Sequence, residues 1–159
     1  MLTGPITPGG HFSWQEAVRT EHRTLLVRNA ESLAASPSAQ AAIRVLCETL
    51  LEPLRAHFGR PVSVHSLFRC ADLNAAIGGS ATSQHIAGER GAACDFHVVG
   101  VPLQDVFDWI RKDSGLMYSQ CILEGRIPSW IHLASVGPAW KGATRQNLRW
   151  DGVSYSRVT

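Results

Sequence analysis

Residues 83–98 read SQHIAGERGAACDFHV, and this stretch joins a polar, glycine-containing turn to a strand. The turn extends to Gly91, and residues 93–98 carry the apolar and aromatic side chains that favour strands. Aspartate is depleted within strands because its charge is costly to bury, so Asp95 needs a partner. A metal ion is one such partner, and a salt bridge or a strand-end cap is another. His85, in the turn directly before the strand, could bind the same ion.

The segments on either side of this stretch alternate between helical and strand patterns. Apolar residues recur at helical spacing over residues 38–57 and predict a long core helix. Pro53 should kink this helix or mark its last turns, and Gly59 should end it. Residues 61–67 (PVSVHSL) alternate as in a strand. Further helices are predicted over 70–77 and 102–112, and further strands over 119–124 and 130–135. This order predicts an α+β domain with a small, mostly antiparallel sheet and packed helices.

The two ends of the chain carry weaker signals. Residues 1–12 are rich in Gly and Pro and predict an extended lead-in, after which Ser13–Glu16 has the capping-box form that starts a helix. Residues 31–40 are rich in Ser and Ala and are expected to connect to the long helix. Residues 138–159 are a weakly patterned tail. A length of 159 residues fits a single domain over residues 1–159.

Composition narrows the classes of function. The formal charge is +2 and no run of Lys or Arg is present, which argues against nucleic acid as a partner. The four cysteines form no C-x-x-C pair and lie among apolar or small residues, so we expect free, buried thiols and a reducing compartment for folding. No stretch approaches the roughly 20 apolar residues of a membrane span, and no export signal is apparent. We therefore expect synthesis in the cytoplasm and no association with a membrane.

A second histidine lies on a later strand. In residues 129–134 (SWIHLA), side chains alternate, so Trp130, His132 and Ala134 share one face while the residues between them point into the core. A polar residue on the less apolar face of a core strand is a place where a site can be built. Two histidines and one aspartate with a fourth position open form a catalytic zinc arrangement.

The chain resembles the zinc D-Ala-D-Ala carboxypeptidase family, which includes phage-encoded cell-wall endopeptidases and shares a fold with the hedgehog signalling domain. The resemblance covers roughly residues 10–135, and the combination of motifs is specific although each piece alone is weak. Its carriers are Arg69, Asn74, Gly78-Gly79-Ser80, Ser83-Gln84-His85, Gly88, Ala93, Asp95-Phe96 and Trp130-Ile131-His132, with His11-Phe12-Ser13 and Leu51–Arg55 upstream.

The resemblance implies a role for each matching residue. The zinc ligands are His85, Asp95 and His132, and Arg69 binds a substrate carboxylate, a task for which a planar guanidinium is suited. From its own sequence context, Arg69 would be interpreted as a surface ion-pair residue. Ser83 is expected to bind substrate or to shape its loop. Trp130 is expected to line the substrate groove or simply to pack.

Two departures from the family pattern affect this assignment. The family separates its first histidine and its aspartate by seven positions, whereas His85 and Asp95 are ten apart, with residues 89–91 as an insertion. His97 shares the face of Asp95 and is the alternative ligand or a residue that supports the ligands. The general base of the family lies a few positions before the last histidine, and here Glu124 precedes His132 by eight.

Glu124 ends its predicted strand and is the candidate that takes a proton from the metal-bound water. Its alternative role is an ion pair with Arg126 or another surface base. We therefore expect a zinc peptidase that cuts the stem peptide of peptidoglycan, at a D-Ala-D-Ala or an L-Ala–D-Glu bond. We expect it to act as a monomer, and the resemblance to phage-encoded endopeptidases suggests a lysis enzyme released to the cell wall. The alternative is a catalytically degenerate wall-binding or virion structural module on the same fold.

Overall fold

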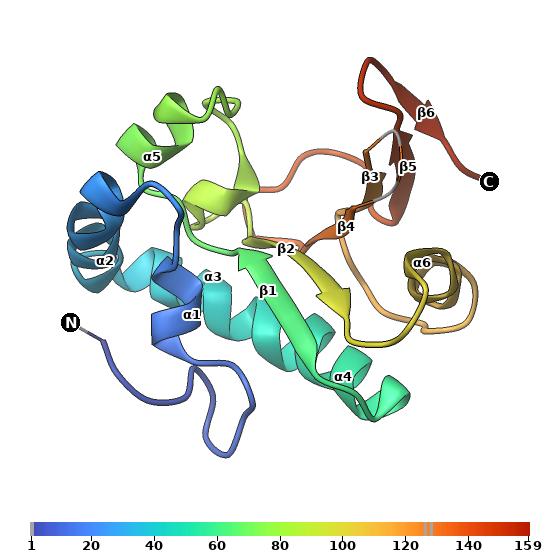
Figure 1. The fold of residues 1–159 in the computed structure, drawn as a ribbon, viewed down its shortest axis with the longest axis horizontal. Coiled ribbons are helices and arrows are strands. Elements are labelled where there is room, and N and C mark those ends of the chain that lie inside the picture. Colours follow the sequence, from blue (N-terminus) through green and yellow to red (C-terminus); the bar gives the residue numbers. More distant parts are fainter. Residues whose placement is uncertain (1, 126, 128) are drawn as a thin grey trace.

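The computed structural model describes residues 2–125, 127 and 129–159. Its centre is a six-stranded sheet with the strand order β1-β2-β4-β3-β5-β6 (Figure 1). Neighbouring strands are antiparallel except for β3 and β5, which are parallel. The strands are β1 (Val62–Ser66), β2 (Ala93–Val98), β3 (Gln120–Glu124), β4 (Trp130–Ala134), β5 (Gln146–Trp150) and β6 (Tyr155–Arg157). The prediction of an α+β fold with a mostly antiparallel sheet is confirmed.

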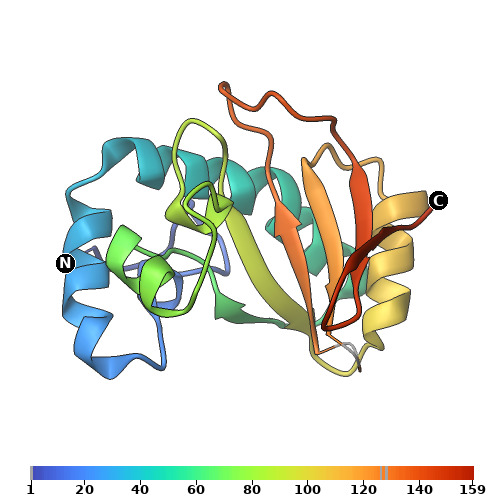
Figure 2. The ribbon, with the colours of Figure 1, turned by 90° about the horizontal axis from the view of Figure 1, so that it is seen from above.

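Helices form the second layer of the structure (Figure 1, Figure 2). Apolar side chains of α3, α4 and α6 pack in one cluster with the inward residues of the strands, such as Phe96 and Leu133. The alternate residues of β2 and β4, including Asp95 and His132, therefore point to the other face of the sheet. The helices are α1 (Trp14–Val18), α2 (Leu26–Ala34), α3 (Pro37–Leu46), α4 (Glu52–Phe58), α5 (Ala71–Ala76) and α6 (Leu103–Lys112).

The predicted long helix is present but is not uniform. It runs from α3 through a π-helical turn at Cys47–Leu51 into α4, and Gly59 ends it in the left-handed conformation at φ 58°. Pro53 has no N–H to donate to the preceding turn, and the wide π turn directly before it accommodates that loss. The expected disturbance at Pro53 therefore takes the form of a π turn.

The start of the chain contains one element that was predicted and one that was not. The Ser13 hydroxyl caps α1 by accepting the amide of Glu16, and the Glu16 carboxylate accepts the Ser13 amide at 2.9 Å. The expectation that residues 31–40 only connect to the long helix is wrong for their first part, because α2 continues to Ala34. Leu33 of α2 is buried in the core. Polar residues interrupt the apolar pattern of this segment, so the sequence did not indicate a helix there.

The tail is more ordered than its sequence suggested. The strands β5 and β6 are formed by residues 146–150 and 155–157, where the sequence pattern was too weak to predict any element. All residues of β5 are half-buried and those of β6 are exposed, so neither strand shows the alternation of a core strand. The parallel pairing of β5 with β3 fixes this hairpin in the sheet.

The four cysteines are free and buried, as predicted. Burial raises the pKa of Cys47 to about 12 and raises the pKa of Cys94 well above its usual range, so both thiols stay protonated. Within the described part of the chain, none of the helices has the length and apolarity required to cross a bilayer.

Candidate metal centre

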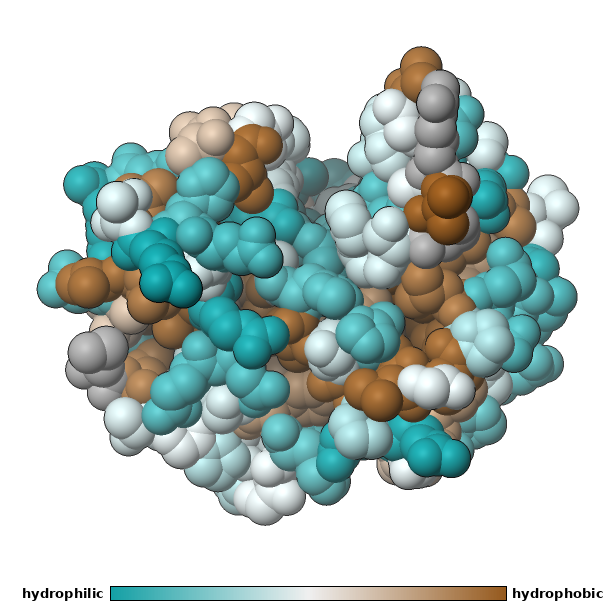
Figure 3. All heavy atoms as spheres, in the orientation of Figure 1, coloured by the Kyte–Doolittle hydropathy of each residue, from teal (hydrophilic) through white to brown (hydrophobic). Residues whose placement is uncertain are grey.

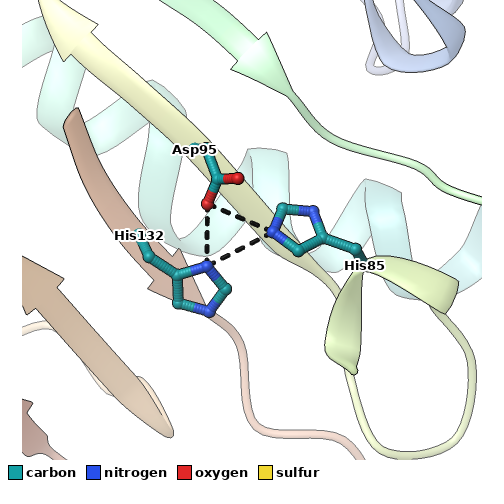
Figure 4. Close-up of side chains that lie close together, drawn as sticks. All are labelled: His85, Asp95 and His132. Atoms are coloured by element: carbon teal, nitrogen blue, oxygen red, sulfur yellow. Dashed lines mark hydrogen bonds and ion pairs between the residues drawn. The ribbon is translucent and has the colours of Figure 1, made fainter. Parts of the chain in front are cut away.

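Three predicted ligands meet on the open face of the sheet (Figure 4). The Nδ1 atom of His132 lies 2.8 Å from Oδ1 of Asp95. The Nε2 atom of His85 lies 3.1 Å from the same oxygen and 3.3 Å from Nδ1 of His132. The sheet register explains part of this arrangement, because Asp95 on β2 is directly opposite His132 on β4.

The third ligand comes from a short 3-10 helix at Gln84–Ile86. The Ser83 hydroxyl accepts the amide of His85 and caps this turn at 3.3 Å. The His85 carbonyl accepts the amide of Arg69, and Nδ1 of His85 lies 2.8 Å from the carbonyl oxygen of Leu67. A carbonyl can only accept, so Nδ1 carries the proton and Nε2 presents its lone pair to the centre.

The donor set fits a four-coordinate metal ion. Ligand distances of about 2.0–2.1 Å place the ligands of a tetrahedral ion roughly 3.3 Å apart. The three atoms of His85, Asp95 and His132 are 2.8–3.3 Å apart, so a small expansion would admit the ion. With three protein ligands, the fourth position remains for water or substrate, as in catalytic sites.

The electrostatics of the centre keep its ligands in the forms that bind metal. Burial lowers the pKa of His85, which favours the neutral imidazole. Burial alone would raise the pKa of Asp95, but the attraction of the two neighbouring histidines in their protonated forms, His85 and His132, outweighs burial and holds that pKa well below its usual range. An ionised carboxylate beside a neutral imidazole is ready for a divalent cation.

Arg69 lies directly against this centre. Its Nη2 donates to Oδ2 of Asp95 at 2.6 Å, and its Nε donates to the Ser66 hydroxyl at 2.8 Å. The two oxygens of the Asp95 carboxylate thus have different partners: Oδ1 faces the histidines, and Oδ2 accepts from the guanidinium. Arg69 therefore orients a candidate ligand, and both residues line the same cavity.

A buried asparagine that the sequence did not single out fixes the segment around Arg69. Asn29 on α2 is fully buried and donates to the carbonyls of Val18 and Phe68 at 3.0 and 3.1 Å. Its side-chain oxygen accepts the amide of Cys70 at 2.7 Å. These bonds hold the backbone on both sides of Arg69. Asn29 lies in a stretch for which no element was predicted, and nothing in the sequence indicated this role.

Replacing Asn29 with alanine is expected to destabilise the protein by about 2–4 kcal/mol, because three backbone groups, two of them in buried hydrogen bonds, lose their partner. Urea unfolding followed by circular dichroism measures this change. A free energy of unfolding within about 0.5 kcal/mol of wild type would show that Asn29 is not a structural clamp.

The metal centre forms the floor of a cavity of about 400 Å³. Its walls come from the loop after α5, with Ser83, and from the side of the sheet that carries Glu124 and the β5–β6 hairpin. Figure 3 shows a notch between these two walls. Trp130, on the face of His132 as predicted, also lines the cavity and is 37% exposed.

Glu124 is half-buried in the wall of this cavity. Burial raises its pKa, and this effect outweighs the opposite influence of His132. Among the described residues, no base forms an ion pair with Glu124. Arg126, the alternative partner, lies outside the described residues.

The structure does not bring His97 into the group of three. Its Nδ1 lies 2.7 Å from Nε2 of His65 on the neighbouring strand β1. His97 follows Asp95 by two positions on β2, one step further along the same face. The group of His85, Asp95 and His132 is complete without it.

Several residues line the cavity without having been singled out as site residues. Those with large or charged side chains include Arg90, Trp140 and Tyr155. Arg90 belongs to the insertion, and the other two belong to the tail, where weak patterning hid their position. The pairing of β6 with β5 brings Tyr155 to the site, and the hydrogen bond from the Ala139 amide to the Glu89 carbonyl holds the segment of Trp140 beside the insertion.

Sequence comparison confirms the resemblance. The model of the family described as Peptidase M15 matches residues 17–134, which is most of the chain and includes all three candidate ligands. No curated protein matches the chain. The protein belongs to the Peptidase M15 family, with His85, Asp95 and His132 as its candidate metal site.

Proposed function

We propose that this protein is a zinc-dependent peptidase that hydrolyses a peptide bond in the stem peptide of peptidoglycan. The observation that carries the proposal is the meeting of His85, Asp95 and His132 on the floor of a cavity that Arg69 and Glu124 also line. Membership of the Peptidase M15 family supports hydrolysis of peptides. The choice of the cell wall rests on the resemblance to carboxypeptidases and endopeptidases that act there.

The residues of the chain divide the work. Zinc, when bound, would polarise the scissile carbonyl and acidify a water molecule. Glu124 would accept a proton from such a water molecule, a role that its raised pKa favours. Arg69 keeps Asp95 oriented and offers its free N–H groups to a substrate carboxylate. Ser83 holds the turn that presents His85.

The proposal predicts release of new amino groups when purified peptidoglycan is treated with the full-length protein and zinc. A chelator should abolish the release, and an excess of zinc should restore it. Mass spectrometry of products from a defined stem peptide then identifies the bond. Bound metal without any new amine would instead support a wall-binding or virion module, the alternative on this fold.

The setting of the reaction is part of the same proposal. Resemblance to phage-encoded endopeptidases supports a role in lysis, with the enzyme made in the cytoplasm and released to the wall. We further propose that the chain acts as a monomer and without nucleic acid or membrane as a partner. The formal charge of +2 supports the exclusion of nucleic acid.

A further inference from the structure

The insertion at residues 89–91 is firmly built into the structure. Gly88 and Gly91 exchange two backbone hydrogen bonds of 3.1 and 2.9 Å, and the Glu89 carbonyl accepts the amide of Ala139 at 2.8 Å. At Gly137, an added Cβ would lie 2.1 Å from the Gly91 nitrogen. The insertion and the segment that follows β4 therefore pack backbone against backbone.

Gln84 connects this unit to the metal centre. It is buried beside His85, and its amide nitrogen donates to the carbonyls of Arg90 and Ser135 at 2.7 and 2.8 Å. Its amide oxygen accepts the Ser119 hydroxyl at 3.0 Å. The turn that carries a candidate ligand thus also fixes the backbone of Arg90.

The side chain of Arg90 is placed at the cavity but is left free for a ligand. Its guanidinium lies 5.5 Å from the centre of the Trp140 ring, a cation–π contact, and both residues line the cavity above the metal centre. Within the described ranges, no carboxylate lies within ion-pair distance of Arg90. An arginine that is positioned by an aromatic ring and lacks an acidic partner is suited to bind an anion.

The sheet places Arg90 at one end of the cavity. Arg90 precedes β2, at the end where Ala93 pairs with Ala134, while Glu124 pairs with Trp130 at the other end. Asp95 lies between these ends, about 7 Å from Ala93 along the strand. An extended peptide advances about 3.4 Å per residue, so a substrate lying along the strands would reach Arg90 roughly two or more residues from the scissile bond.

We propose that Arg90 and Trp140 form a second carboxylate-binding subsite, which selects stem peptides with a free carboxylate at a distance from the bond that is cut. This inference rests on the proposed function. It makes Arg90 a specificity-determining residue and gives the insertion a role. Arg69 serves a carboxylate next to the metal centre, and Arg90 serves one further along the peptide.

The test uses the full-length protein loaded with zinc. Synthetic stem peptides with all carboxylates free are compared with the same peptides in which one distal carboxylate at a time is a carboxamide. Wild type should show kcat/KM roughly ten- to a hundredfold higher for the acid at one position, the size expected of one charge-assisted hydrogen bond. Product peptides with the free carboxylate should also bind more tightly in calorimetry, which needs no turnover.

Variants then test whether Arg90 is the residue responsible for this preference. R90Q should equalise the acid and the amide at that position with little change for the amide, and R90K should keep only part of the preference, since an ammonium lacks the planar fork. R60Q removes an exposed arginine outside the cavity and should keep the full preference.

Three outcomes bear on the inference. Equal rates for acid and amide in wild type, or a preference that persists in R90Q, would overturn the subsite while leaving the peptidase proposal intact. Failure of wild type to cut either peptide or purified peptidoglycan would reject the proposed function itself. Loss of the preference in R90Q alone would support the inference.

Discussion

Replacement of His132 with alanine is expected to lower kcat/KM on peptidoglycan fragments by roughly 10³-fold or more. His132 offers Nδ1 to the centre at 2.8 Å from Oδ1 of Asp95, and its loss leaves only two protein ligands. A bound metal supplies several kcal/mol of transition-state stabilisation, and each 1.36 kcal/mol corresponds to about tenfold in rate. Amine release measures the rate, and mass spectrometry with an inductively coupled plasma measures the metal.

The matched control is His11→Ala. This variant removes an exposed histidine that contacts Glu52 and is not one of the three grouped ligands. We expect it to keep its metal content and activity. Retention of wild-type activity by a folded H132A protein would exclude His132 as a ligand.

Replacement of Glu124 with glutamine is expected to reduce kcat by about 10²–10⁴-fold while the metal stays bound. Glutamine has nearly the same shape and cannot accept the proton of the attacking water. Because Glu124 is not among the three grouped ligands, the metal content should match wild type. The two variants therefore separate proton transfer from metal binding. Activity of E124Q within a few-fold of wild type would assign the base to another group.

The pH dependence gives an independent test of Glu124. Burial raises its pKa above the ordinary value of 4.5, and the base acts only when it is ionised. The rate should therefore be low below this pKa and rise as the pH increases through it, on the acid side of the profile for kcat/KM. In E124Q the remaining slow reaction should lack this limb. An unchanged acid limb in E124Q would show that another group titrates there.

Sequence patterns predicted the elements that build the floor of the site. The strands around Asp95 and His132 and the helix over residues 102–112 follow from local alternation and helical periodicity, and their predicted bounds agree with the structure to within about one residue. The strand pattern also indicated that Asp95, a charged residue within a buried strand, needs a partner. They could not place Asp95 opposite His132, since strand register depends on contacts between distant segments.

The parts that were not predicted depend on such distant contacts as well. Strand β5 pairs with β3 through half-buried residues, so no apolar alternation marks it. Asn29 acts through backbone groups of residues far from it in the sequence. Arg90 looked like part of a tolerated insertion, and only contacts with distant segments, such as the packing of Gly137 against Gly91, show that this insertion is held in place.

The most direct test of the account is the zinc content of the full-length wild-type protein after saturation with zinc and removal of free metal. We predict about one zinc per chain, bound by His85, Asp95 and His132. Circular dichroism confirms that the sample is folded. A folded wild-type protein that retains no zinc would contradict the metal centre and, with it, the peptidase mechanism.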